Sequence, residues 1–245
     1  MAHHLIACDT FQRAWVEACQ HLLAVRGQSH NLFVTIRDPL YDDPVFESRV
    51  ESFCRSLNLL TPRQVAYTIF PSTLSRHRSA QSLALAYNRK NGFFARLKSR
   101  YPGPMRWGTY FRRLTHYELG EEPINQLGKI IDAINARTKA HRAAYSMIIQ
   151  RPGTENTMPR GGPCLNYLAL HGHRQDGRRH LGLLAVYRNH DFLQRAYGNY
   201  LGLGQLLGFI CQETGCEVGE LVCVSSHAYI KKARALNAFL ASLPR

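Results

Sequence analysis

Cys164-Leu-Asn-Tyr-Leu-Ala-Leu170 and His180-Leu-Gly-Leu-Leu-Ala-Val-Tyr187 are two strand-like stretches, and Gln175-Asp-Gly-Arg178 lies between them. Apolar residues dominate both stretches, as they do in strands that pack against a core. The Asp-Gly pair suits a tight turn whose two central residues take positive φ. The sequence therefore predicts an antiparallel β-hairpin in the second half of the chain.

Other elements of the second half follow from the same kind of pattern. Further strands are predicted at Ala143–Ile149 and Val218–Val224. One helix is predicted from Ala196 to Thr214, because Gly215 directly after it is a typical helix stop. A C-terminal helix is predicted to begin near Lys231. Another helix is predicted to start with Pro123 in its first turn and to run through Ala136, with one stripe of leucine and isoleucine.

In the first half, Thr10 is a predicted cap for an opening helix that ends at Gly27. A strand is expected at Asn31–Ile36, followed by helices at about 44–57, 62–70 and 76–98 and a break at Tyr101–Met105. With 245 residues and 45% apolar composition, the chain can bury one substantial core. We expect one α/β (α+β) domain over residues 1–245, with antiparallel strands prominent in its second half.

Charge and cysteine content restrict the class of protein. Lys and Arg outnumber Asp and Glu by 31 to 17, which favours anionic partners such as phosphorylated small molecules or nucleic acid. No stretch approaches the roughly 20 apolar residues of a membrane span, and the start lacks a signal-peptide pattern. The seven cysteines are odd in number and scattered. This pattern predicts a cytoplasmic protein with no membrane association and no structural metal.

Several residues of the second half suit chemistry at a ligand. Cys164 follows Gly161-Gly-Pro163, a flexible approach that can hold a thiol at the rim of a cavity, and the positive charge of Arg188 should lower the pKa of this thiol. Of the other cysteines, Cys8 is expected to be exposed near the N-terminus, and five are expected to be buried and inert: Cys19, Cys54, Cys211, Cys216 and Cys223. Arg188 and Asn189 come at the end of a predicted strand, where a guanidinium fork and an amide suit phosphate oxygens. Each of these residue types also occurs in purely structural positions, so their joint order carries the argument.

In that order the chain resembles the thymidylate synthases, whose site reads Pro-Cys, then Tyr-x-Arg-Ser-x-Asp, then an asparagine, and finally His-x-Tyr. The matching positions are Pro163-Cys164, Tyr187-Arg-Asn-His-Asp191, Asn199 and His227-Ala-Tyr229. Gly219-Glu220 matches the lead-in to the last strand, and Gly103–Gly108 matches the family's Gly-Pro-x-Tyr-Gly loop with Trp107 in place of tyrosine. The resemblance covers residues 122–230, the nucleotide-site half, while residues 1–121 are a diverged N-terminal half.

The resemblance implies a thymidylate-synthase-like mixed β-sheet with helices packed on it, and a homodimer joined sheet to sheet. It implies that Cys164 adds to C6 of a pyrimidine nucleotide monophosphate. The one-carbon unit would come from 5,10-methylenetetrahydrofolate, by methylation or hydroxymethylation at C5. The remaining roles follow residue by residue: phosphate binding by Arg188, Asn189 and the partner subunit's Arg142, base binding by Asn199 and Asp191, sugar binding by His227 and Tyr229, and folate contact or stacking by Trp107, Tyr110 and Asp191.

The chain departs from the family in two respects. The family's Glu-Leu-x-Trp-Phe-Leu helix, whose glutamate handles protons, has no counterpart, and Glu47, Glu51 and Glu118 are the possible substitutes. The chain also ends soon after the His-x-Tyr strand, without the tail that closes the family's site. A more open site admits water, which would favour a hydroxymethyl product over a methyl product.

Three functions therefore stay open on the sequence. The first is one-carbon transfer to C5 of a uridine-type nucleotide, and uracil is preferred over cytosine because Asn199 offers both a donor and an acceptor. The second is an enzyme of the same fold that keeps the nucleophile and the anion pocket but acts on another acceptor, such as a heteroaromatic intermediate of a biosynthetic pathway. The third is non-catalytic binding of nucleotides or RNA, although the basic residues are not interleaved with regularly spaced aromatics. Nothing in the sequence distinguishes ribose from deoxyribose.

Overall fold

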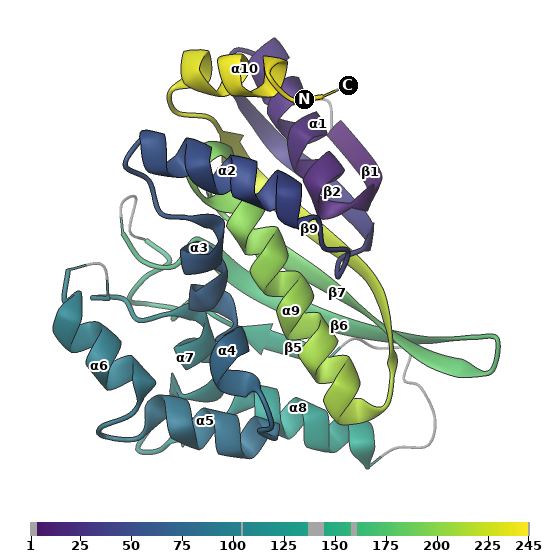
Figure 1. The fold of residues 1–245 in the computed structure, drawn as a ribbon. Coiled ribbons are helices and arrows are strands. Elements are labelled where there is room, and N and C mark those ends of the chain that lie inside the picture. The colour runs from purple at the N-terminus through teal and green to yellow at the C-terminus, as the bar shows by residue number, and fades with distance from the viewer. Residues whose placement is uncertain (1–3, 104, 137–144, 158–160, 245) are drawn as a thin grey trace.

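The computed structural model describes residues 4–103, 105–136, 145–157 and 161–244. Over these residues the chain has a mixed α/β architecture, in which helices pack against a mixed sheet (Figure 1). The strands, in chain order, are β1 (His4–Thr10), β2 (Gln28–Asp38), β3 (Tyr117–Glu118), β4 (Pro123–Ile124), β5 (Tyr145–Ile148), β6 (Leu165–Gln175), β7 (Arg178–Tyr187), β8 (His190–Asp191) and β9 (Glu217–Tyr229). The expected α/β class is confirmed.

The main sheet joins the two halves of the chain. Its order is β1-β2-β9-β7-β6-β5, and β8 pairs with β9 beside this path. The pairs β1–β2, β7–β9 and β8–β9 are parallel, whereas β2–β9, β6–β7 and β5–β6 are antiparallel. Because β2 pairs with β9, the N-terminal segment and the C-terminal strand belong to the same sheet.

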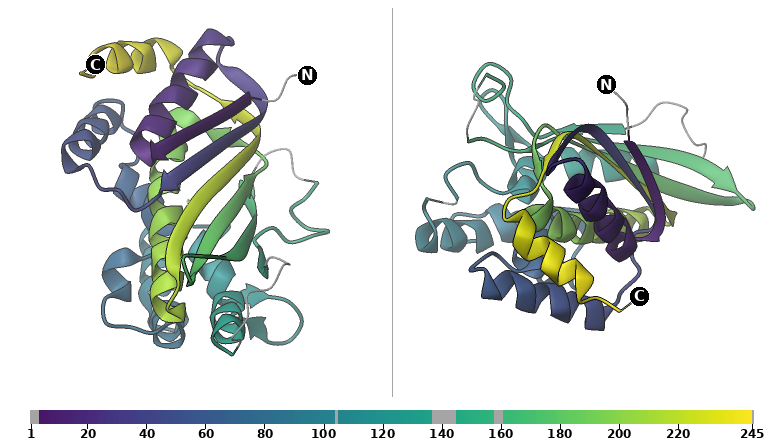
Figure 2. Two further views of the ribbon diagram at one scale, coloured as in Figure 1. Left: turned by 90° about the vertical axis from the view of Figure 1, so that its right-hand side faces the viewer. Right: turned by 90° about the horizontal axis from the view of Figure 1, so that it is seen from above.

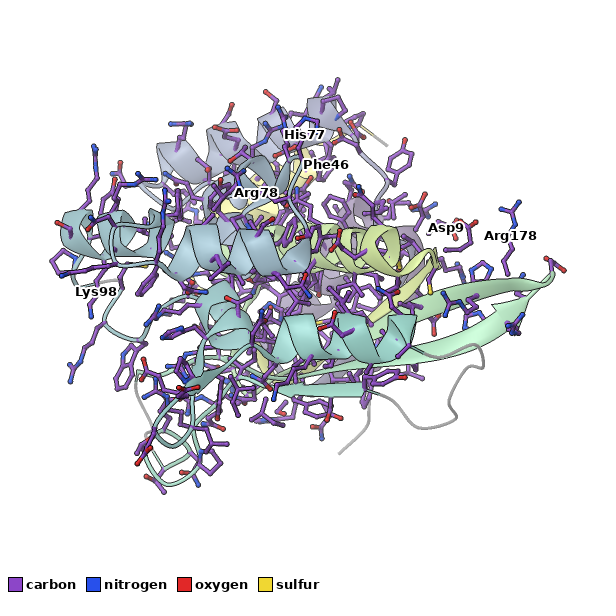
Figure 3. All side chains as sticks on the ribbon, turned by 90° about the horizontal axis from the view of Figure 1, so that it is seen from below. Asp9, Phe46, His77, Arg78, Lys98 and Arg178 are labelled. Atoms are coloured by element: carbon purple, nitrogen blue, oxygen red, sulfur yellow. The ribbon has the colours of Figure 1, made fainter. Side chains whose placement is uncertain are left out.

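The predicted hairpin is formed by β6 and β7. Gln175 is paired with Arg178, and between them Asp176 and Gly177 have φ of 51° and 76°. Positive φ at both central residues is the conformation that an Asp-Gly turn favours, so the prediction is confirmed. The tip projects past the rest of the sheet, with Arg178 at its end (Figure 3).

The helices begin and end largely where sequence signals place them. They are α1 (Phe11–Ala24), α2 (Pro44–Ser56), α3 (Pro62–Ile69), α4 (Ser72–Ser75), α5 (Ala80–Asn88), α6 (Phe93–Arg100), α7 (Tyr110–Thr115), α8 (Gln126–Asn135), the π-helical turn η1 (Phe192–Ala196), α9 (Tyr197–Thr214) and α10 (Ala233–Ala241). The Thr10 side chain accepts a hydrogen bond from the Arg13 amide at the start of α1, and Gly215 ends α9 in the left-handed conformation.

Four local predictions need correction. Pro123 lies in β4, and Asn125 caps α8 instead, because its side chain accepts from the Gly128 amide. The helix expected at 76–98 is divided into α5, which ends at Asn88, and α6, which begins at Phe93 after the N-cap residue Gly92. A strand, β1, precedes the opening helix, and β9 extends to Tyr229 beyond the expected end at Val224.

The two faces of the sheet differ. One row of side chains crosses all six strands of the main path and is buried beneath the helices: Ile6, Val34, Cys223, Ala185, Leu168 and Met147. The neighbouring row on the opposite face contains no fully buried residue: Leu5, Phe33, Val224, Val186, Tyr167 and Ile148. In Figure 2 the main helical layer lies on one side of the sheet, and no described helix covers the centre of the other.

None of the helices in the described part of the chain combines the length and apolar character needed to cross a membrane.

Candidate functional site

A cavity of about 370 Å³ opens where β6 begins and where β7 and β9 end. The carboxyl ends of neighbouring parallel strands are a common place for ligand sites in α/β proteins. Seven of the residues predicted for the site line this cavity: Trp107, Tyr110, Cys164, Asn189, Asp191, Asn199 and Tyr229. Arg188 and His227 lie next to lining residues without lining the cavity themselves, and Arg142 lies outside the described residues.

Cys164 is half-buried directly before β6 and is the only cysteine among the described residues that line the cavity. Burial raises the pKa of the Cys164 thiol, while the charges of Arg188 and Arg195 oppose that shift. The expectation that positive charge would leave this thiol with a lowered pKa is therefore wrong, because the cost of burying a thiolate exceeds the attraction of the two cations. The thiol is largely protonated at neutral pH.

The other cysteines are mostly buried, as expected. Cys19, Cys54, Cys211 and Cys223 lie in the core, and burial raises the pKa of each thiol. Two expectations are wrong: Cys216 is only half-buried, and Cys8 is buried on β1 where an exposed position was expected. Cys8 is buried because β1 pairs with β2 in the sheet and directs that side chain toward the helices.

Arg188 holds the loop in front of Cys164. Its guanidinium donates hydrogen bonds to the carbonyl oxygens of Pro163, at 3.2 Å, and of Gly161. Its backbone amide also donates to the Cys164 carbonyl at 2.9 Å. Arg188 therefore positions the loop that carries the thiol, and its contact with a phosphate stays a prediction.

Two of the predicted polar residues contact each other beside the cavity. The His227 Nδ1 lies 2.8 Å from the Asn189 Oδ1, an oxygen that can only accept, so His227 donates this hydrogen bond. The His227 ring also stacks on Tyr229 at 5.5 Å. Burial, and then the neighbouring His30, lower the pKa of His227. His227 therefore orients Asn189 and Tyr229, the two residues of this group that line the cavity.

Asp191 is occupied by structural hydrogen bonds. Its Oδ1 accepts from the amides of Leu193 and Gln194, at 3.2 and 3.0 Å, and thereby caps η1. Burial, and then the neighbouring Asp191 carboxylate, raise the pKa of Tyr229 to about 12. Among the described residues that line the cavity, Asp191 is the only carboxylate.

The three glutamates considered as substitutes for the family's catalytic glutamate lie elsewhere. They pair with arginines outside the cavity: Glu47 with Arg63, Glu51 with Arg55, and Glu118 with Arg112 and Arg151. None of these three glutamates can therefore take the place of the family's catalytic glutamate at the cavity.

Trp107 and Tyr110 form one wall of the cavity. The Trp107 ring packs over Gly161, where an added Cβ would lie 3.2 Å from the indole and where φ is +83°. Glycine is therefore required for both the conformation and the contact. The Tyr110 hydroxyl accepts from the Leu165 amide at 3.4 Å, and burial raises the pKa of Tyr110 to about 12.

A buried ion pair supports this wall from behind. The Arg113 guanidinium donates to both carboxylate oxygens of Glu155, at 2.9 and 2.7 Å, and their side chains are only 7% and 4% exposed. Arg113 also donates to the carbonyl oxygens of Trp107 and Ile149. One side chain thus joins the Trp107 loop, the end of β5 and the loop that contains Glu155.

Among the described residues, no group of three or more His, Cys, Asp or Glu side chains is arranged to hold a metal ion.

Comparison with known proteins identifies no family for this chain. No protein-family model matches the chain, and no curated protein matches it. The residues that line the cavity, and the sequence motifs that contain them, are therefore the features that point to a function.

Three further residues at the cavity were not predicted. Arg195 and Lys231 line it, and Arg195 forms no ion pair with any described carboxylate. Lys231 lies over the Tyr229 ring at 5.4 Å. Two cations near one already bonded carboxylate favour an anionic ligand. Helical spacing could have identified Arg195 from the sequence. It lies four residues after Asp191 and four before Asn199, so a helix would place it on the same face as both.

The third unpredicted residue is His190, which contacts both the sheet and the cavity. Its Nδ1 lies 2.9 Å from the Ser225 Oγ, and its Nε2 lies 3.0 Å from the Asn199 Nδ2. Its ring stacks on Tyr187 with a centroid distance of 4.0 Å. No spacing rule identified it, because the neighbours of a buried ring depend on the pairing of β8 with β9.

We expect the alkylation of Cys164 by iodoacetamide to accelerate about tenfold per pH unit below its raised pKa, because only the thiolate reacts. Exchanging Arg195→Gln removes a charge that stabilises the thiolate and should slow alkylation at pH 8 by about threefold or more. Mass spectrometry of the Cys164 peptide between pH 6 and 9 measures both effects. A rate that reaches its plateau below pH 8 would contradict the raised pKa.

Proposed function

We propose that this chain binds a uridine-type nucleotide monophosphate in the cavity and transfers a one-carbon unit to its C5 atom through Cys164. The observation that carries this proposal is that residues predicted for one nucleotide site, from separate segments of the chain, line a single cavity: Trp107, Tyr110, Cys164, Asn189, Asp191, Asn199 and Tyr229. The cavity thus brings together a thiol, two side-chain amides and an aromatic wall from segments that are far apart in the sequence.

The side chains support the steps of this chemistry. The Cys164 thiolate forms a bond to C6 of the pyrimidine, and the electron pair displaced from the ring makes C5 nucleophilic. Arg195 and Arg188 favour the thiolate against the cost of burial. Asn199 lines the cavity, and its amide would hydrogen bond to the ring edge of the bound base. After the new bond at C5 has formed, the C5 proton passes to water and the bond between the one-carbon unit and the folate nitrogen breaks, which leaves an exocyclic methylene group at C5. Either a hydride from the tetrahydrofolate, giving a methyl group and dihydrofolate, or a water molecule that loses a proton, giving a hydroxymethyl group, then adds to this methylene, and the bond between C6 and sulfur breaks to release the cysteine as thiolate.

The cavity also has features that suit a folate. Leu60, Met105 and Trp107 provide apolar and aromatic lining, which is suited to a flat heterocycle such as a pterin. Bound methylenetetrahydrofolate would supply the one-carbon unit. The residues of this chain would orient the two rings and limit access of water.

The experiment that tests the proposal is incubation with UMP or dUMP and methylenetetrahydrofolate, followed by mass analysis of the nucleotide. We expect a mass gain of a methyl or a hydroxymethyl group with one of the two nucleotides, which also identifies the sugar and the product. The Cys164→Ser variant should give no mass gain. Product formation by that variant, or no product from either nucleotide, would contradict the proposal.

The proposal includes a thymidylate-synthase-like fold and a two-fold dimer that is joined through the sheets. Its support is the apolar row on the face that no described helix covers, from Leu5, which is 74% exposed, to Ile148, which is 40% exposed. Apolar side chains across a whole sheet gain stability when a second layer covers them. In such a dimer the partner subunit's Arg142 would complete the phosphate site.

We expect light scattering at micromolar concentration to give twice the 27.9 kDa chain mass. An interface of this kind should bury more than about 2,000 Å². The Val224→Glu variant places a charge in the middle of the row and should dissociate the dimer, because it buries an unpaired carboxylate. Lys98→Glu on α6, away from the sheet (Figure 3), is the matched control. A monomeric wild-type protein would remove the dimer and the shared phosphate site.

A second candidate is non-catalytic binding of a pyrimidine nucleotide in the same cavity. Two observations favour it: burial raises the pKa of Cys164, and Asp191 is the only carboxylate among the described lining residues and is already hydrogen bonded. Under this alternative the nucleotide binds with the same selectivity, but no covalent bond forms. The trapping experiment in the Discussion separates the two candidates.

A further inference from the structure

His190 connects the interior of the sheet to the cavity through two hydrogen bonds. The residue is 1% exposed, and its two ring nitrogens face Ser225, which is fully buried, and Asn199, which is 3% exposed. His190 and Asn199 both line the cavity. Its hydrogen bonding therefore bears directly on how Asn199 is presented to a ligand.

The direction of these hydrogen bonds follows from their chemistry. The Asn199 Nδ2 carries only hydrogens to donate, so the His190 Nε2 must accept. The imidazole proton is then on Nδ1, which donates to the Ser225 Oγ. Burial lowers the pKa of His190 to about 3, so the ring is neutral at ordinary pH and keeps one acceptor nitrogen.

The His190 ring has little room to turn. It lies parallel to the Tyr187 ring, with an interplanar angle of 6° and a centroid distance of 4.0 Å. Phe192 packs against it at 4.9 Å. If the Asn199 amide rotated by half a turn, its Oδ1 would face the His190 Nε2, and two acceptors would meet at about the present 3.0 Å. That orientation is unfavourable as long as His190 keeps its proton on Nδ1.

We propose that His190 is a specificity-determining positioning residue, which holds the amide nitrogen of Asn199 inward and leaves its Oδ1 for the ligand. The site then accepts a ring whose facing edge carries an N–H donor, as uracil does at N3. A cytosine ring presents an acceptor at N3 and would leave two acceptors opposed. This inference rests on the proposed function for the class of ligand, whereas the orientation of Asn199 does not depend on it.

The orientation is tested in the ligand-free protein by nitrogen-15 NMR on labelled histidine and asparagine side chains. We expect the His190 signals of a neutral ring protonated at Nδ1, with no titration between pH 5 and 8. The Asn199 amide hydrogens should exchange slowly, and faster in the His190→Leu variant. A ring protonated at Nε2, or one that titrates in this range, would overturn the proposal whatever the ligand is.

Selectivity is tested by calorimetry with UMP and CMP. The wild-type protein should prefer UMP, and His190→Leu should reduce the ratio of the two affinities by about tenfold or more, because the amide can then rotate. His190→Gln can place its Oε1 near the position of Nε2 and should restore much of the ratio. Phe192→Leu is the matched control, since it loosens the packing around His190 without removing a side-chain hydrogen bond.

Each outcome has one meaning. An unchanged ratio in a folded His190→Leu variant overturns the inference, and so does an equal loss in Phe192→Leu, because packing alone would then explain the effect. If the wild-type protein binds neither nucleotide, the proposed function fails. The NMR experiment then still decides whether His190 orients Asn199.

Discussion

A 5-fluorinated uridine monophosphate, incubated with the protein and methylenetetrahydrofolate, should become covalently attached to the peptide that contains Cys164. The bond between Sγ and C6 forms as in turnover, and the one-carbon unit is added at C5. Fluorine cannot leave C5 as the proton does, so the final elimination that frees the cysteine is blocked. The adduct should therefore accumulate and survive denaturation, where a productive nucleotide would be released.

The controls follow from the exposure of the thiols. Cys164→Ser should give no adduct, because serine lacks the thiolate that attacks C6. Cys216→Ser should give the full amount, since Cys216 is half-buried but does not line the cavity. An adduct on another cysteine would overturn the assignment of Cys164. No adduct, with nucleotide binding intact, would favour the non-catalytic candidate.

Exchanging Arg113→Leu should destabilise the protein by about 3–5 kcal/mol, because it leaves the Glu155 carboxylate buried without its partner. The variant also removes hydrogen bonds to the carbonyl oxygens of Trp107 and Ile149. Denaturant unfolding measures the loss. Because Arg113 supports the Trp107 wall, the conformation around the cavity should be disturbed before global unfolding.

The matched control is Arg178→Leu, which breaks the pair with Glu217, whose side chains are 73% and 50% exposed. It should cost less than about 1 kcal/mol, because solvent screens exposed pairs. If both variants lose the same stability, burial is not the reason for the effect of Arg113.

The pH dependence of the buried pair has a defined sign. Burial raises the pKa of Glu155, but the hydrogen bonds and charge of Arg113, with the Arg151 amide, outweigh it and lower the pKa overall. The pair therefore adds its full contribution to the free energy of unfolding above the unfolded-state pKa of glutamate, about 4.3. This contribution is lost as the pH falls through the lower pKa that Glu155 has in the folded protein. The free energy of unfolding of the wild-type protein should therefore decrease as the pH is lowered below about 4. In the Glu155→Gln variant the free energy of unfolding should depend less on pH in this range.

Much of the local structure was predicted because its signals are local. These signals act through hydrogen bonds or dihedral angles within a few residues. They are Thr10 before an apolar stripe, Gly215 after one, and Asp176-Gly177 between two strand-like runs. Pro123 was assigned wrongly because its fixed φ suits a strand as well as the first turn of a helix, and the β4 pairing with β3 decided between them.

The sequence by itself determined many of the local elements and predicted seven of the residues that line the cavity, five from the motifs around Cys164, Tyr187–Asp191, Asn199 and Tyr229 and two, Trp107 and Tyr110, from the segment near Gly108. Only the tertiary structure decided what surrounds them. Arg188 contacts loop carbonyl oxygens, Arg195 and Lys231 enter the cavity, and His190 joins Ser225 to Asn199. It also decided that burial outweighs positive charge at Cys164. Desolvation and nonlocal strand pairing depend on segments far apart in the chain, and no local pattern contains that information.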